Sequence, residues 1–456
     1  RQHWYHLLKM QIRHPIARIS SPIATPIFNL PKPKIPFSHI HKRKLLHPQS
    51  CKAQPKTSHQ VSQKSFWGAV GLIIGTAVGP GMLGLPAATL KSGPIPSTIT
   101  IIASWVYVIS SIILVAELSF SAMKEDKVEE VSFTSIATKA FGPHFGAFVA
   151  LVYASLSFSL MVACVSGIGS IVSQCVPHVK PFFSHCVYPL SIAILMVFFP
   201  FSTIDNTNRF LCFFMIFSIA SLIFVGLPIV NFNVANSWEA SSILKAVPVA
   251  VLTLGFHVVT PFICKVAGDS LSDAISAILI GGAAPLMMVL SWNTIVLGLS
   301  NVAESSIKND AIAVLLGVNR NALWAVKGFA FSALATSLIG YAVSFPKQIV
   351  DTLKLISREG EQEEKEEDEK KEKKEKLLMM AVMSLAVLIG SFFPSVFSKA
   401  LDFAGVYANC FLFGILPPAM AYARNRKKKE KSSVLPGGNF TLFLLFAVAV
   451  FLAIRH

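Results

Sequence analysis

Long apolar segments recur along the chain and are separated by short polar connections. A bilayer core of about 30 Å requires about 20 apolar residues in a helix. Eleven segments approach or exceed this length, at approximately 66–90, 97–120, 145–174, 183–203, 209–230, 245–265, 271–299, 324–350, 377–395, 399–423 and 439–454. The pattern therefore predicts an all-α integral membrane protein with about eleven transmembrane helices.

The composition indicates a lipid environment for most of the chain. Hydrophobic residues make up 53% and charged residues 14% of the 456 residues, whereas soluble domains carry about 25% charged residues. A chain so poor in charge cannot cover its apolar surface with polar groups. Residues 65–454 are therefore expected to form one polytopic domain.

The first 64 residues differ from the rest of the chain. They contain twelve Lys and Arg and no Asp or Glu, since the first acidic residue is Glu117. A basic, acid-free leader without a continuous apolar run is typical of an organelle transit peptide. We expect residues 1–64 to direct the protein to the chloroplast envelope, at its inner membrane. Targeting to mitochondria, or a disordered tail of a plasma-membrane protein, are the alternatives.

The formal net charge of +16 at pH 7 comes mainly from this leader. The remaining residues hold 28 basic and 24 acidic side chains, so the basicity does not indicate nucleic-acid binding. A second charged segment lies between the eighth and ninth predicted spans, where sixteen of the eighteen residues 359–376 are charged. Such blocks are usually solvated linkers, and residues 357–376 are expected to form a mobile loop.

The first span contains residues that interrupt a helix. Four glycines and a proline lie within residues 75–84, and Gly79, Pro80 and Gly81 are adjacent. Gly costs about 1 kcal/mol and Pro about 3 kcal/mol in a helix interior. A break inside the bilayer must face protein or a polar cavity. Its free carbonyl groups can then bind a cation, and the N–H groups of the next half-helix can bind a carboxylate. The alternative is a kinked helix that uses its glycines for close packing.

The sixth span carries a similar interruption, with Gly255, Phe256, His257 and Pro261 at its middle. Interrupted first and sixth spans are typical of a five-plus-five inverted repeat around a site at the membrane midplane. An ionisable residue within a span, such as His257, is a functional candidate. A neutral histidine bonded to a backbone carbonyl is the alternative.

These segments together resemble the tryptophan/tyrosine permease family, the hydroxy and aromatic amino acid permeases of the amino acid–polyamine–organocation superfamily. The resemblance covers about residues 66–454 and is carried by residues 75–86, 153–169, 255–261, 336–340 and 401–417. It implies a leucine-transporter-type fold and proton-coupled uptake of aromatic amino acids. The family includes organelle-targeted plant members.

The resemblance also implies roles for individual residues. The substrate site is expected at Ala77, Gly79, Gly81, Phe256 and His257, with the amides near Gly79 and Gly81 on the substrate carboxylate. The hydroxyl groups of Thr336 and Ser337, with carbonyl groups at Gly75, Val78 and Ala333, match a sodium site of sodium-coupled relatives. Hydroxyl and carbonyl oxygens suit a hard cation.

Two alternatives remain open at the coupling site. Thr and Ser hydroxyls in a span can instead bond to their own helix. Glu117 is a possible proton carrier or an interfacial acid at the end of the second span. Residues 210–230 contain no lysine, so proton coupling through a lysine of the fifth span, as in some relatives, is not supported.

The chain lacks the motifs that would indicate an enzyme or an ATP-driven pump. It has no His-Glu-x-x-His, no Gly-x-Ser-x-Gly and no P-loop. We expect no catalytic residues, no cofactor and no metal centre. The expected protein is a secondary active symporter in the lipid bilayer, whose partners are an amino acid and a coupling cation, H⁺ or Na⁺. A non-transporting sensor on the same fold and a transporter of another small zwitterionic solute are the alternatives.

Overall fold

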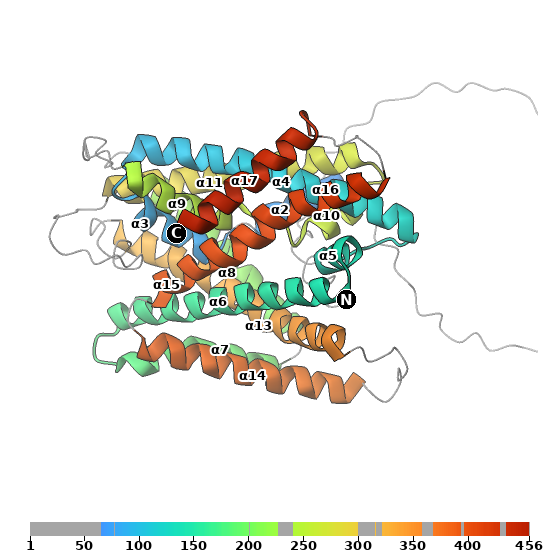
Figure 1. The fold of residues 1–456 in the computed structure, drawn as a ribbon. Helices are drawn as coiled ribbons and strands as arrows, with labels where there is room; N and C mark the ends of the chain where they lie inside the picture. The colour runs from blue at the N-terminus through green and yellow to red at the C-terminus, as the bar shows by residue number, and fades with distance from the viewer. Residues whose placement is uncertain are drawn as a thin grey trace, which may run out of the picture. The chain divides into compact units, whose positions relative to one another are not determined.

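The structure is a computed structural model whose described residues are entirely helical in their regular secondary structure (Figure 1). It describes residues 65–76, 78–199, 201–226, 240–299, 315, 322–357, 368–393, 396–428 and 435–455. Within them, seven segments are long and apolar enough to cross a membrane, or eight if one bent helix pair counts as a span. Two shorter apolar helices accompany them. The predicted all-α membrane fold is confirmed.

The first predicted span is broken into two helices, α2 (Phe66–Thr76) and α3 (Pro80–Thr89), which are bent by 55°. Gly79 precedes α3 with an extended backbone, at φ −157° and ψ −172°. Pro80 follows it and lacks the N–H that a continuous helix would need. The predicted interruption is confirmed, and a merely kinked helix is excluded.

The sixth predicted span is also broken, into α9 (Ala240–Leu254) and α10 (Thr260–Ala267). Residues 255–259 between them form tight turns, in which the Val259 N–H donates to the Phe256 carbonyl oxygen over 3.1 Å. A Cβ at Gly255 would lie 2.7 Å from a ring carbon of Phe413 and 2.9 Å from the Val251 carbonyl oxygen. The glycine therefore permits a close approach that no other residue allows.

The remaining predicted spans fall on helices that are each unbroken, with one exception. The unbroken ones are α4 (Pro94–Asp126), α6 (Pro143–Cys175), α7 (Pro181–Phe198), α8 (Phe201–Gly226), α11 (Leu271–Leu299), α13 (Leu323–Ser357), α14 (Asp368–Phe392) and α17 (Asn439–Arg455). The exception is the tenth span, which consists of α15 (Val396–Phe403), the π-helix η1 (Ala404–Ile415) and α16 (Leu416–Lys428).

Three features differ from the sequence-based expectation. A short helix, α5 (Phe133–Phe141), precedes the third span and starts at a capping box between Ser132 and Ser135. The fifth span begins at Phe201 rather than near residue 209. Residues 368–376 of the expected charged loop are helical and open α14, because alternating acidic and basic residues are good helix formers. The rest of that loop, residues 358–367, lies outside the described residues, as do residues 1–64.

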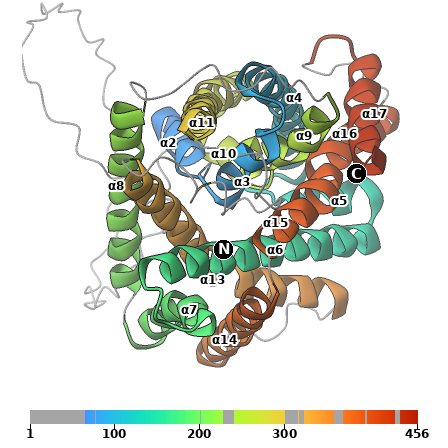
Figure 2. The ribbon, with the colours of Figure 1, turned by 90° about the vertical axis from the view of Figure 1, so that its left-hand side faces the viewer.

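The helices form two groups, visible in Figure 2. The broken spans α2, α3, α9 and α10 pack with α4 and α11. In the second group α6, α7, α13 and α14 pack against one another, and α8 packs on α13. The interface between the groups includes contacts of α3 with both α6 and α13.

Large apolar side chains are exposed along α8. The exposed fractions are 68% for Phe210, 71% for Phe213, 62% for Phe217 and 83% for Phe224. Their spacing places them on one face of the helix, and such a continuous apolar face is unstable in water. This face therefore contacts lipid.

The free ends of the two broken spans are joined on one side of the fold. The Ser65 N–H donates to the Val266 carbonyl oxygen over 2.8 Å, and the Ser65 hydroxyl accepts from the Gly68 N–H over 3.1 Å. Ser65 thus caps the start of α2 and ties it to the last turn of α10. The two helices also pack along each other.

Candidate functional site

A cavity of about 280 Å³ lies beside both helix breaks. Its walls come from the two broken spans and from α6, α8, α13 and η1. The predicted site residues on its surface are Gly75, Val78, Gly79, Gly81, Phe256, Thr336 and Ser337. The sequence prediction thus identified both breaks and the facing part of α13. Ala77 lies outside the described residues.

The beginning of α3 presents backbone N–H groups at this cavity. The first N–H groups of a helix have no acceptor within the helix. In α3, Pro80 has no N–H, the Met82 N–H donates to the Gly79 carbonyl oxygen over 3.2 Å, and no side-chain cap is found among the described residues. Gly79 and Gly81 lie on the cavity wall at this end. Because a helix N-terminus carries a partial positive charge, this wall suits an anionic group.

The ends of α2 and α9 supply the opposite polarity. The last carbonyl groups of a helix are unpaired within the helix and carry a partial negative charge. Gly75 and Thr76 at the end of α2, and Leu252 and Thr253 near the end of α9, line the cavity. A molecule that bears both a carboxylate and an ammonium group matches this arrangement of helix ends.

The two hydroxyl groups expected at a cation site have different partners. The Ser337 hydroxyl donates to the Val78 carbonyl oxygen at the first break, over 3.4 Å. The Thr336 hydroxyl donates to the carbonyl oxygen of Ala333 in its own helix, over 3.0 Å. Ser337 therefore links α13 to the break. The Thr336 hydroxyl bonds within its own helix, which is one of the two alternatives that the sequence left open. Ala333 is fully buried and not among the residues on the cavity wall.

His257 does not line the cavity. Its side chain is fully buried, and neither ring nitrogen has a hydrogen-bond partner among the described residues. The ring instead stacks on Phe413, with centroids 4.3 Å apart and planes 14° from parallel. Among the described residues, the His257 ring is therefore not bonded to a backbone carbonyl, and it does not contact the cavity.

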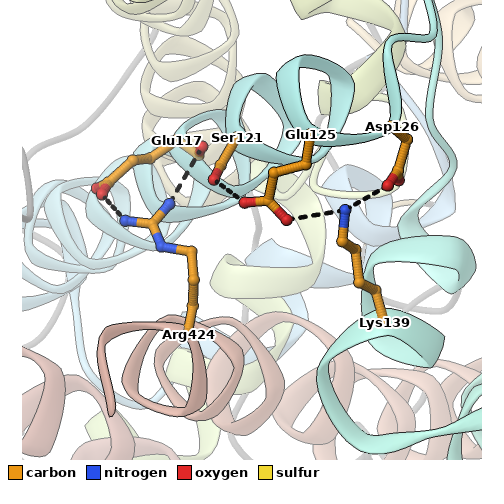
Figure 3. Close-up of polar contacts among 6 residues, drawn as sticks. All are labelled: Glu117, Ser121, Glu125, Asp126, Lys139 and Arg424. Carbon is orange, nitrogen blue, oxygen red and sulfur yellow. Dashed lines mark hydrogen bonds and ion pairs between the residues drawn. The ribbon is translucent and has the colours of Figure 1, made fainter. Parts of the chain in front are cut away.

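Glu117 lies away from the cavity and away from the end of its helix. It is 8% exposed within α4, which continues to Asp126, and its carboxylate forms an ion pair with Arg424 of α16 (Figure 3). The Arg424 guanidinium also donates to the Glu117 carbonyl oxygen over 3.4 Å. The expected helix-end position is wrong, because the helix extends beyond the apolar stretch.

A further ionic contact lies along the same helix toward its end. The Lys139 ammonium of α5 is 2.9 Å from a Glu125 carboxylate oxygen and 2.6 Å from one of Asp126 (Figure 3). Partial desolvation lowers the pKa of Lys139, but the hydrogen bonds and charges of the two carboxylates raise it above its usual value overall. α4 is thus tied by ion pairs to both α5 and α16.

Aromatic residues that the sequence did not single out as site residues complete the cavity wall. Tyr153 of α6, Tyr341 of α13 and Phe413 of η1 lie there with Phe256. The two tyrosines could have been suspected, since a phenol in the middle of an apolar span needs a polar neighbour. No local signal marks Phe413 among the 35 phenylalanines of the chain.

The membrane-spanning fold and the cavity at two helix breaks define a multi-pass membrane transporter. The chain belongs to the tryptophan/tyrosine permease family, whose sequence model matches residues 62–456. It is 25% identical to the tyrosine-specific transport system 1 of Haemophilus influenzae over 84% of this chain and 94% of that protein. It is 23% identical to the tryptophan-specific transport protein of the same organism over 85% of this chain and 95% of the relative.

The fold agrees with that of a solved transporter. A manganese transporter from Eremococcus coleocola superposes with a TM-score of 0.54, at 12% sequence identity, over 85% of both chains. With its broken first and sixth spans, the protein has the leucine-transporter-type fold. The resemblance seen in the sequence is confirmed for both family and fold.

Proposed function

We propose that this permease is a symporter that moves an aromatic amino acid, tyrosine or tryptophan, together with H⁺ or Na⁺. The observation that carries the proposal is the cavity at the two helix breaks, where helix ends of both polarities meet aromatic side chains. Relatives that match nearly their full length are tyrosine- and tryptophan-specific transport proteins. A membrane protein of this family acts as a permease rather than an enzyme.

The helix ends orient the substrate. The amides of Gly79 and Gly81 at the start of α3 bind its carboxylate, and carbonyl groups at the ends of α2 and α9 bind its ammonium group. The aromatic ring then packs against Phe256, Tyr153 and Tyr341, which share the cavity wall. Offset or edge-on aromatic contacts add about 0.5–1.5 kcal/mol each beyond the burial of area.

The coupling cation binds next to the first break. The Val78 carbonyl oxygen and the Ser337 hydroxyl are already within hydrogen-bond distance of each other, and Gly75 and Thr336 lie on the same wall. The Ala333 carbonyl oxygen accepts a hydrogen bond from the Thr336 hydroxyl. Oxygen ligands of this kind suit Na⁺. For H⁺ coupling, Glu117 is the candidate as the buried carboxylate among the residues whose side chains are described, and its pairing with Arg424 favours a structural role.

Uptake by the full chain reconstituted in liposomes tests the proposal. Labelled tyrosine, tryptophan, phenylalanine and leucine are offered under a pH gradient alone, a Na⁺ gradient alone, or neither. We expect accumulation of tyrosine or tryptophan above equilibrium under one of the two gradients. Binding without flux would instead identify a sensor, and accumulation of leucine alone would identify a different zwitterionic substrate.

We also propose that residues 1–64 direct the protein to the inner membrane of the chloroplast envelope. The support is compositional, since this segment has twelve basic and no acidic residues. A fusion of residues 1–64 to a fluorescent protein, expressed in plant cells, tests it. Accumulation in plastids is the expected result, whereas mitochondrial or cytosolic fluorescence contradicts it.

A further inference from the structure

Phe413 occupies an unusual part of the cavity wall. It belongs to η1, a π-helix of twelve residues in the tenth span. π-Helical turns are rare and frequently lie at functional sites. Phe413 is the residue of η1 that lines the cavity.

Two residues of the break in the sixth span contact the ring of Phe413. His257 stacks on it almost in parallel, with 4.3 Å between the centroids. Gly255 lies so close that a Cβ there would be 2.7 Å and 2.9 Å from two ring carbons. Both contacts come from the segment that separates α9 from α10.

The backbone of Phe413 is fixed as well. The Ser111 hydroxyl of α4 donates to the Phe413 carbonyl oxygen over 2.5 Å. At the neighbouring Gly414, a Cβ would lie 2.6 Å from the Cβ of Ala449 in α17 and 2.7 Å from the Tyr107 hydroxyl. With the backbone held by α4 and α17, the orientation of the ring depends on its contacts with His257 and Gly255.

In the described part of the chain, no hydrogen bond accounts for a histidine at position 257. Its side chain is fully buried and does not reach the cavity, and its ring nitrogens have no hydrogen-bond partner among the described residues. Burying an imidazole without hydrogen bonds is costly. The contact that links this side chain to the cavity wall is the stack of its flat ring on Phe413.

From these contacts we propose that Phe413 is a specificity-determining residue and that His257 is its positioning residue. Phe413 presents a planar wall to the aromatic ring of the substrate, and His257 holds that wall in place by stacking. The inference rests on the proposed transport of aromatic amino acids. It adds the residues that make the site prefer substrates with an aromatic side chain. His257 acts through Phe413 and neither touches the substrate nor carries the coupling proton.

Kinetics of tyrosine uptake in liposomes test the inference. The variants are His257→Phe, which keeps a planar ring, His257→Leu, which removes it, and Phe413→Leu. We expect His257→Phe to keep the KM for tyrosine within about twofold and to keep the response to whichever gradient, H⁺ or Na⁺, drives the wild type. His257→Leu and Phe413→Leu raise the KM roughly 2- to 10-fold, as expected for the loss of one aromatic contact, with a smaller effect on the maximal rate.

Two further measurements separate positioning from general damage. The double variant His257→Leu/Phe413→Leu has the same KM as Phe413→Leu alone, because His257 acts through Phe413. Unlabelled leucine competes better with labelled tyrosine in Phe413→Leu than in the wild type. Phe413→Trp, which keeps a planar wall, retains the discrimination against leucine even if Phe413→Leu does not insert.

The outcomes distinguish this inference from the proposed function. A wild-type protein that accumulates neither tyrosine nor tryptophan refutes the proposed function. Wild-type uptake with an unchanged KM in His257→Leu and Phe413→Leu refutes the inference alone. A His257→Phe variant as impaired as His257→Leu, or one that has lost its response to the gradient that drives the wild type, shows that the ring nitrogens are required and also overturns the inference.

Discussion

The Ser337 hydroxyl donates a hydrogen bond of 3.4 Å to the carbonyl oxygen of Val78, across 259 positions of sequence. This contact joins α13, in one group of helices, to the break of the first span, in the other. A cation bound by both oxygens would hold the two groups together at the cavity.

Ser337→Ala is expected to raise the cation concentration that gives half-maximal uptake about tenfold, equivalent to about 1.4 kcal/mol. The variant removes one oxygen ligand from the proposed cation site. Uptake is measured against the coupling cation, Na⁺ or H⁺, at fixed substrate. Ser332→Ala is the matched control, because the Ser332 hydroxyl bonds within α13, to the Gly328 and Phe329 carbonyl oxygens. Equal responses of both variants would contradict a cation site at Ser337.

Gly79→Leu is expected to abolish uptake while the protein still inserts. A Cβ at Gly79 would lie 3.6 Å from the Ser337 hydroxyl oxygen, an ordinary contact, so Gly79→Ala should retain transport. The additional atoms of leucine would occupy the cavity wall at the start of α3. Gly71→Leu in the same span is the control, since a Cβ there meets no atom within 4 Å. Normal transport by Gly79→Leu would place the site elsewhere.

Gly81→Ala is expected to lower the thermal stability by about 1–3 kcal/mol, the usual cost of overpacking. Its Cβ would lie 2.9 Å from the Thr253 hydroxyl oxygen and 3.3 Å from the Thr253 Cα, so α3 and α9 would have to separate. Unfolding of the purified protein is followed by tryptophan fluorescence. Adding Thr253→Ala should recover part of the loss, because it removes the nearest atom. Strictly additive losses would contradict the proposed clash.

Glu117→Ala is expected to destabilise the protein by up to about 3 kcal/mol, because it leaves the partly buried Arg424 charge without its carboxylate partner. The double variant Glu117→Leu/Arg424→Met should be more stable than Glu117→Ala, since it removes both charges. Thermal unfolding measures this difference. Glu117→Gln should still show uptake driven by the coupling cation. Complete loss of coupling in a stable Glu117→Gln variant would instead support a proton carrier.

Local chemistry explains which parts of the site were predictable. Gly79, Pro80 and Gly81 break a helix through their own backbone properties, so the first interruption could be located from sequence. Gly255 marks the second interruption for the same reason. The hydroxyls of Thr336 and Ser337 were placed on the correct helix, but their different partners depend on the exact rotation of α13.

Contacts between distant segments explain what the sequence missed. The stack of His257 on Phe413 depends on a π-helix, and nothing in the local composition of residues 404–415 requires one. The sequence predicts Glu117 at the end of the second span because the continuous apolar segment ends close to it. Its partner, Arg424, lies 307 positions away in the sequence. The ion pair with Arg424 compensates the charge of the Glu117 carboxylate inside the fold.

The hydrogen bond between the Ser65 N–H and the Val266 carbonyl oxygen has a mechanical consequence. It connects α2, whose last residues line the cavity, to α10, and both contacting atoms belong to the backbone, so among substitutions at these two residues Ser65→Pro alone would remove the donor. We expect α2 and α10 to shift as one body when the cavity opens on that side. Opening on that side would then require both half-helices to move together.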